Sequence, residues 1–184
     1  MLQEANQIER NGFLKVRRRI FDNENHAFFV TFSCYRRRRI LDNDRAKGVV
    51  VHFLAAQIKN QEGMCIGFVI MPDHVHALVK FHETGRLSTF MNQWKRRSSM
   101  QLKDLFKTVI KPYGEKMDLE KPMWQAKYYC FNVFTQKKIR QKLTYMHNNP
   151  VKAGLAERPE DWRFGSARWY LLNKPVGVPI TRVG

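Results

Sequence analysis

The stretch that decides the fold is residues 64–80, MCIGFVIMPDHVHALVK. Met64–Ile70 and His74–Lys80 are apolar runs of strand length, and the Pro-Asp pair between them favours a tight turn. The sequence therefore predicts a β-hairpin. His74 and His76 stand at positions i and i+2 of the second strand, so both side chains leave the same face of the sheet.

Two neighbouring imidazoles make this face a candidate metal site, because neutral histidine nitrogen is a common ligand of divalent cations. A third ligand must come from another element. Two imidazoles favour later transition metals, whereas phosphate chemistry usually employs Mg²⁺ or Mn²⁺. We expect one of these two ions if the substrate is a phosphodiester.

Outside the hairpin, the chain alternates between strand and helix patterns. In chain order, the predicted elements are strand Ala27–Cys34, helix Asp44–Asn60, strand Met64–Ile70, strand His74–Lys80, helix Ser88–Phe106, a strand within Met123–Val133, and a helix from Thr135 or Gln136 to Asn149. Asp42, Asn43 or Asp44 can cap the first helix, Ser88 the second, and Pro150 ends the last. This order predicts an α+β protein with a ferredoxin-like βαββαβ sheet and an extra C-terminal helix that carries the nucleophile proposed below.

The charge of the chain points to a polyanionic partner. The formal net charge is +17 over 184 residues, with a pI near 10.2. Nucleic acid is the first expectation for such an excess, and anionic membrane the second. The candidate DNA-binding cations are Arg17, Arg18, Arg19, Arg36, Arg37, Arg38, Arg39, Lys95, Arg96, Arg97, Lys138 and Lys142.

Other classes of protein are disfavoured. No apolar run reaches membrane-spanning length, and the first residues lack the apolar core of a signal peptide. Cys34, Cys65 and Cys130 are odd in number and far apart, which predicts buried thiols instead of a disulfide framework. We expect a cytoplasmic, nucleoid-associated bacterial protein with no membrane partner.

The last helix supplies the remaining candidate groups. A helical wheel at about 100° per residue places Ile139, Leu143 and Met146 on a buried stripe. The polar residues on one flank of this stripe are Lys138, Lys142, Tyr145 and Asn149.

That flank suits phosphodiester chemistry. Tyr145 can attack phosphorus, and the side-chain oxygen of Asn149 can be the third metal ligand. Lys138 or Lys142 can hold phosphate oxygens or favour the phenolate. The products would be a covalent 5′-phosphotyrosine and a free 3′-hydroxyl, so strand rejoining needs no ATP.

Four segments stand out together: Phe29–Ser33, Gly67–His76, Tyr145–Leu155 and Asp161–Ala167. With these segments, residues 15–170 resemble the single-tyrosine transposases that carry a His-hydrophobe-His motif, and most of all the REP-associated tyrosine transposases. The resemblance implies a ferredoxin-like domain that uses Mg²⁺ or Mn²⁺ and cuts single-stranded DNA near a folded hairpin.

Within that resemblance, His74 and His76 match the metal-binding pair and Tyr145 matches the nucleophile. Asn149 stands where the insertion-sequence relatives have Gln, so the amide is kept on a shorter side chain. Those relatives are dimers that exchange helices. For this chain both a monomer and a homodimer stay open.

We expect a basic N-terminal arm (1–25), a catalytic domain (26–156) and a tail that packs on it (157–184). Two other functions compete with the nuclease. The first is a non-enzymatic binder of single-stranded RNA or DNA, favoured by aromatic and basic residues that alternate between Trp124 and Phe131. The second is a replication initiator or relaxase, which usually carries further domains.

Overall fold

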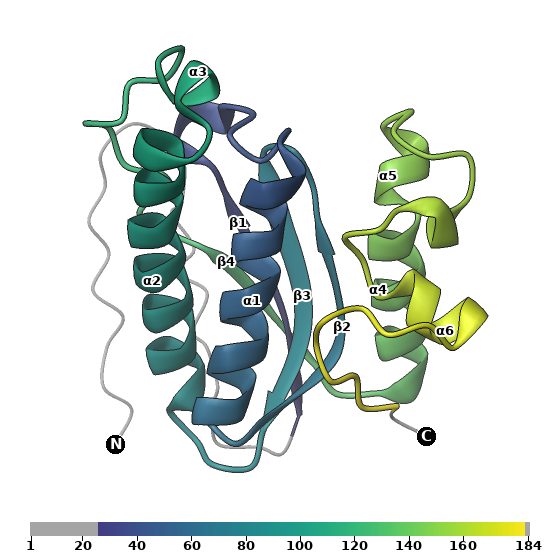
Figure 1. The fold of residues 1–184 in the computed structure, drawn as a ribbon. Coiled ribbons are helices and arrows are strands. Elements are labelled where there is room, and N and C mark those ends of the chain that lie inside the picture. The colour runs from purple at the N-terminus through teal and green to yellow at the C-terminus, as the bar shows by residue number, and fades with distance from the viewer. Residues whose placement is uncertain (1–25, 183–184) are drawn as a thin grey trace, which may run out of the picture.

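The protein is built on an antiparallel four-stranded sheet with helices on both faces. The structure, a computed structural model, describes residues 26–182 (Figure 1). The strands are β1 (Ala27–Ser33), β2 (Gly63–Ile70), β3 (His74–Phe81) and β4 (Tyr129–Val133), in the spatial order β2-β3-β1-β4. With one helix in each crossover, this order is the ferredoxin-like arrangement, and the predicted α+β class is confirmed.

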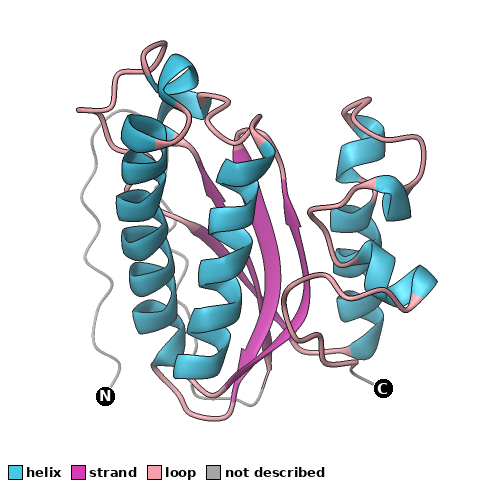
Figure 2. Cartoon of the chain, viewed as in Figure 1, coloured by secondary structure: helices cyan, strands magenta, loops and turns pink. Residues whose placement is uncertain are grey.

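Helices cover the two faces unequally (Figure 2). The long helices α1 (Asp44–Asn60) and α2 (Arg86–Thr108) lie on one face, and α4 (Gln136–His147) packs against β2 and β3 on the other. The shorter helical elements are η1 (Tyr35–Arg37), α3 (Lys111–Gly114), α5 (Asn149–Lys152), η2 (Pro159–Asp161) and α6 (Ala167–Leu172). None of the helices between residues 26 and 182 is both long and apolar enough to cross a membrane.

Side chains alternate along each strand, and this alternation determines which residues lie on each face of the sheet. In β3, Val75 and Ala77 join the core beneath α1 and α2, whereas Leu78 belongs to the smaller core beneath α4. Side chains at i and i+2 of a strand share a face. His74 and His76 precede Leu78 by four and two residues, so their side chains lie on the same face as that of Leu78. This is the face that α4 covers.

A glycine lets α4 approach the sheet closely. A Cβ atom on Gly67 of β2 would lie 2.5 Å from Cδ2 of Leu143, 2.7 Å from Cε of Met146 and 3.0 Å from Oγ of Ser166. Real Cβ atoms do not come this near to other atoms. The absence of a side chain at Gly67 therefore leaves the space that Leu143 and Met146 of α4 fill against the sheet.

One predicted boundary was wrong. Helix α2 begins at Arg86, because Gly85 adopts a φ of +80° that only glycine takes easily, and Ser88 lies inside the helix instead of capping it. The residues between α2 and β4 include the short helix α3, where no helix was predicted. The strand predicted within Met123–Val133 is confirmed as β4. The first helix, by contrast, is capped by Asn43, whose side chain accepts from the N–H of Arg45.

The prediction that Pro150 ends the helix was also wrong. The N–H of Asn148 donates to the carbonyl of Thr144, and the N–H of Lys152 donates to the carbonyl of Asn148. The helical path thus continues from α4 into α5. Pro150 sits in the first turn of α5, where its missing N–H and fixed φ are tolerated.

The last residues cover the edge of β2. The N–H of Ile70 donates to the carbonyl of Phe164, that of Ser166 to the carbonyl of Phe68, and that of Thr181 to the carbonyl of Cys65. An exposed sheet edge invites pairing with another chain. Here the chain fills this edge with its own tail.

Candidate active site

The two histidines of β3 form the centre of the site. Their ring centroids are 4.8 Å apart, and both rings lie on the face of the sheet that α4 covers. His76 is 5% exposed. The stacked ring of Phe29, on the adjacent strand β1, lies 5.4 Å from that of His76. Burial among apolar groups fixes the orientation of the second imidazole.

A carboxylate orients the first imidazole. The Nδ1–H of His74 donates to Oδ1 of Asp73 over 2.6 Å, and Oδ2 of Asp73 pairs with Nε of Arg37 at 2.8 Å. Nδ1 is thereby occupied, which leaves Nε2 of His74 as the candidate ligand atom. Burial lowers the pKa of His74, and its hydrogen bond to Asp73 acts in the opposite direction.

A hydroxyl orients the second imidazole. Antiparallel pairing of β1 with β3 places Thr31 opposite His76, and Oγ1 of Thr31 lies 2.6 Å from Nδ1 of His76. Burial lowers the pKa of His76 to about 3, so the ring is neutral at physiological pH. Its Nε2 is buried and has no hydrogen-bond partner within the described residues.

Helix α4 brings Tyr145 to the same place. The centroid of its ring is 5.5 Å from that of His76 and 6.1 Å from that of Phe29. The tyrosine is 45% exposed, so its phenol stays open to a substrate. Tyr145 and His76 thus come together within one chain.

Two lysines flank this phenol. Nζ of Lys142 and Nζ of Lys152 each lie 6.0 Å from the ring centroid of Tyr145. Lys142 also sits 4.7 Å above the rings of Phe29 and Phe131, and partial burial lowers its pKa. The two ammonium groups give the neighbourhood of Tyr145 a positive charge suited to a phosphate.

The third candidate ligand is an amide. No group of three His, Cys, Asp or Glu side chains that could hold a metal occurs in residues 26–182. Asn149, at the start of α5, is partly buried, and its Nδ2 has no hydrogen-bond partner among the described atoms. An amide oxygen can coordinate a cation, and the role of Asn149 as third ligand stays a prediction.

Comparison with known proteins places the chain in a family. Residues 22–149, well over half of the chain, match the family described as "Transposase IS200 like". The chain belongs to the IS200-like transposases.

Two relatives of this family member are informative. A Haemophilus influenzae protein whose name assigns it as a REP-associated tyrosine transposase is 26% identical over 106 residues, which span 55% of this chain and 57% of the relative. The match thus covers little more than half of that relative. A solved structure of a REP-associated tyrosine transposase bound to a REP hairpin has a TM-score of 0.66 at 17% identity, over 91% of this chain and 93% of the other. The second likeness establishes a shared fold.

The structure of this IS200-like chain gives most members of its arginine cluster internal partners. Arg37 pairs with Asp73 and donates to Ser33. Arg38 donates to the carbonyls of Asp118 and Pro122. Arg39 forms a bidentate ion pair with Asp42. Arg36 is exposed, with its guanidinium 5.4 Å from the ring of Tyr35. Of the four, Arg36 has the guanidinium most available for DNA, and its role stays a prediction.

The other residues predicted to bind DNA differ in how accessible their charged groups are. Nζ of Lys95 donates to the carbonyls of Gln125 and Ala126, so its ammonium group is engaged within the protein. Arg96, Arg97 and Lys138 are exposed. Arg17, Arg18 and Arg19, with the rest of the predicted arm of residues 1–25, lie outside the described residues. Their contacts with DNA stay predictions.

Sequence reasoning missed several residues around the site. Thr31 is 45 positions from His76, and only the strand register brings them together. Asp73 was assigned to the turn, although a carboxylate next to a candidate ligand was a usable signal. Lys152 was overlooked because the helix was expected to stop at Pro150, and a helix continued through Pro150 returns Lys152 to the face of Tyr145.

Proposed function

We propose that the chain is a metal-dependent endonuclease and strand transferase that acts on single-stranded DNA at REP-type hairpins through a 5′-phosphotyrosine intermediate. The observation that carries the proposal is the 5.5 Å separation of the rings of Tyr145 and His76, beside an imidazole nitrogen that is buried without a partner in the described part of the chain. Membership of the IS200-like family supports DNA processing. The relative solved with a REP hairpin supports the choice of substrate.

The residues present fit a divalent cation. His74 and His76 would hold it through Nε2, since their Nδ1 atoms are already engaged by Asp73 and Thr31. The side-chain oxygen of Asn149 would be the third protein ligand. Bound there, Mg²⁺ or Mn²⁺ would neutralise charge that develops on the scissile phosphate.

The nucleophile in this mechanism is the phenol oxygen of Tyr145. It attacks phosphorus, a new O–P ester bond forms, and the bond from phosphorus to the 3′ oxygen breaks. The phenol proton passes to solvent, and the leaving 3′ oxygen takes a proton to become a hydroxyl. Lys142 and Lys152 stabilise negative charge on the reacting groups. One phosphate ester replaces another, so the strand can be rejoined without ATP.

A covalent-adduct assay tests the proposal. The full chain is incubated with a hairpin-bearing oligonucleotide and Mn²⁺, and the products are separated under denaturing conditions. We expect a protein–DNA adduct that Tyr145→Phe abolishes. Tyr129→Phe is the sharpest control, because Tyr129 is 42% exposed and pairs with Thr31 on the same face of the sheet.

Binding without an adduct, on several candidate hairpins, would favour the non-enzymatic alternative. One support for that alternative is weaker in the structure than in the sequence. Trp124 is 5% exposed, and its Nε1 donates to Oγ of Ser98. This ring is therefore part of the core and does not offer a stacking surface for bases.

A further inference from the structure

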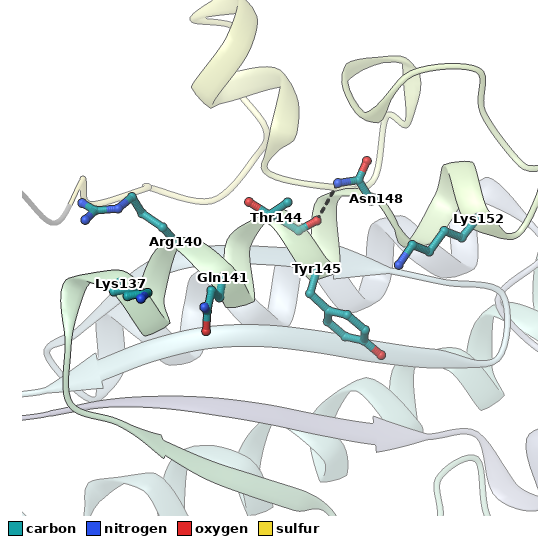
Figure 3. A pocket seen from close by; sticks show the side chains of 7 residues that line it. All are labelled: Lys137, Arg140, Gln141, Thr144, Tyr145, Asn148 and Lys152. Atoms are coloured by element: carbon teal, nitrogen blue, oxygen red, sulfur yellow. Dashed lines mark hydrogen bonds between the residues drawn. The ribbon is translucent and has the colours of Figure 1, made fainter.

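A shallow groove runs along the outer side of α4 and into α5, next to the candidate nucleophile (Figure 3). It encloses about 510 Å³. The residues that line it are Lys137, Arg140, Gln141, Thr144, Tyr145, Asn148 and Lys152. We refer to this feature as the α4 groove.

The lining of the α4 groove is cationic. Lys137, Arg140 and Lys152 contribute three positive charges, and no carboxylate is among the described residues that line it. Within residues 26–182, the side chains of Lys137 and Arg140 have no hydrogen-bond or ion-pair partner. They differ in this from Arg38 and Arg39, whose guanidinium groups are engaged inside the protein. Charges left without internal partners are available to an anionic ligand.

The spacing of these groups fits a chain of phosphates better than a single anion. Lys137 and Lys152 are 15 positions apart along a nearly continuous helical path, which corresponds to roughly 20 Å at the rise of an α-helix. The strip is thus long enough for several nucleotides. Gln141 and Asn148 lie between the cations, and their amides can donate to or accept from base edges.

Tyr145 connects the groove to the reaction site. Its ring lines the α4 groove and also contacts His76, so any strand that presents a phosphate to the phenol must continue past one of these two sides. Figure 3 shows Lys137 and Gln141 preceding Tyr145 along the helix, and Lys152 reaching back toward it from α5.

We infer that the α4 groove is the track for the unpaired DNA strand on one side of the scissile phosphate. In this inference, which rests on the proposed function, Lys137, Arg140 and Lys152 contact successive phosphates and Gln141 contacts a base. The inference places the duplex stem of the hairpin outside the α4 groove. The groove therefore contributes affinity for the single-stranded flank and not for the duplex stem.

The test compares hairpins with and without a single-stranded extension. Binding of a labelled DNA hairpin, bare or extended on its 5′ or 3′ side, is measured by fluorescence anisotropy in EDTA, so that no cutting occurs. The variant is Lys137→Gln with Arg140→Gln. The matched control is Lys116→Gln with Lys121→Gln, which removes the same charge from exposed residues around α3 at the far end of α2.

We expect the groove variant to lose roughly tenfold in affinity for one extended hairpin near physiological salt, because two single-strand phosphate contacts are removed. The log–log salt slope for that ligand should fall by about 1.4. Affinity for the bare hairpin should stay unchanged, and the control should match the wild type.

Equal binding of the extended hairpins by variant and wild type would overturn the inference. So would an equal loss for bare and extended hairpins, since the groove would then contact the stem. These binding results are independent of the adduct assay that tests the proposed chemistry. A missing phosphotyrosine adduct would end the catalytic proposal but would not affect a loss of binding that is specific to the extended hairpins. Equal binding by variant and wild type would end the inference about the groove but would not affect an observed adduct.

Discussion

At the scale of single residues, the two imidazoles are held by different partners. A carboxylate fixes Nδ1 of His74 and a hydroxyl lies against Nδ1 of His76, so Nδ1 is engaged in both rings. The parity of a strand was enough to predict that these rings share a face. Their partners were not predictable, because Thr31 reaches His76 through tertiary pairing.

Asp73→Asn tests the role of the carboxylate. The substitution keeps an acceptor but removes the charge that orients His74 and raises its basicity, so Mn²⁺ affinity should fall by about 10- to 100-fold. Isothermal titration of metal into the DNA-free protein measures this. Asp104→Asn on α2 is the control for a lost carboxylate. Unchanged Mn²⁺ affinity in Asp73→Asn would show that the Asp73 hydrogen bond does not support metal binding.

His147 should make stability depend on pH. Burial lowers its pKa to about 4, whereas the unfolded chain binds a proton near 6.5, so the unfolded state holds more protons between these values. The free energy of unfolding should therefore fall as pH drops from about 6.5 to 4. In His147→Gln this fall should be shallower by up to about 1.4 kcal/mol per pH unit.

Urea unfolding of the metal-free protein at a series of pH values checks this, with the exposed His82→Gln as the matched control. Parallel curves for wild type and His147→Gln would contradict the expectation. The neutral ring also lies 2.7 Å from Oγ of Ser166, which accepts from the N–H of Phe68. The same histidine thus joins α4 to the tail and to β2.

At the scale of secondary-structure elements, the packing of α4 against the sheet determines where Tyr145 lies. The apolar stripe Ile139, Leu143 and Met146 was visible in the sequence, and all three side chains pack into the core beneath α4. The close approach at Gly67 was not visible, because a glycine in a strand has several explanations. The continuation through Pro150 was missed because the usual rule for proline applies to helix interiors and not to first turns.

Two glycine-to-alanine substitutions distinguish the steric effect of an added methyl group from its effect on the freedom of the backbone. Gly67→Ala places a methyl group against Leu143, Met146 and Ser166, and should destabilise the protein by about 1–3 kcal/mol. Gly48→Ala, inside α1 with nothing within 4 Å of the new Cβ, should stabilise it by about 0.5–1 kcal/mol. Chemical denaturation measures both. A neutral or stabilising Gly67→Ala would mean that α4 does not depend on this contact.

At the scale of the whole molecule, the candidate residues of the site come together within one chain. Tyr145 lies against His76 of the same chain, and the tail occupies the edge of β2. The sequence had left monomer and helix-exchanged dimer open, because neither the position of α4 nor the path of the tail follows from local patterns. The sheet order did follow, because alternating elements with short connections leave few topologies.

Mixing two inactive variants tests whether one chain suffices. Tyr145→Phe and His76→Ala each lack one half of the site, so a mixture should form no more covalent adduct than either variant alone. Restored adduct in the mixture would show that α4 is exchanged between subunits. Wild type mixed with each variant is the control for losses caused by dilution.

The central claim is that the phenol of Tyr145 and the imidazoles of β3 act on one phosphate. The most direct measurement is mass spectrometry of tryptic peptides from the protein after reaction with a hairpin oligonucleotide and Mn²⁺. The account predicts a nucleotide 5′-phosphate on the peptide of residues 143–152, whose one tyrosine is Tyr145. A modification on the peptide of residues 128–137, or no modified peptide from a DNA that is cut, would contradict it.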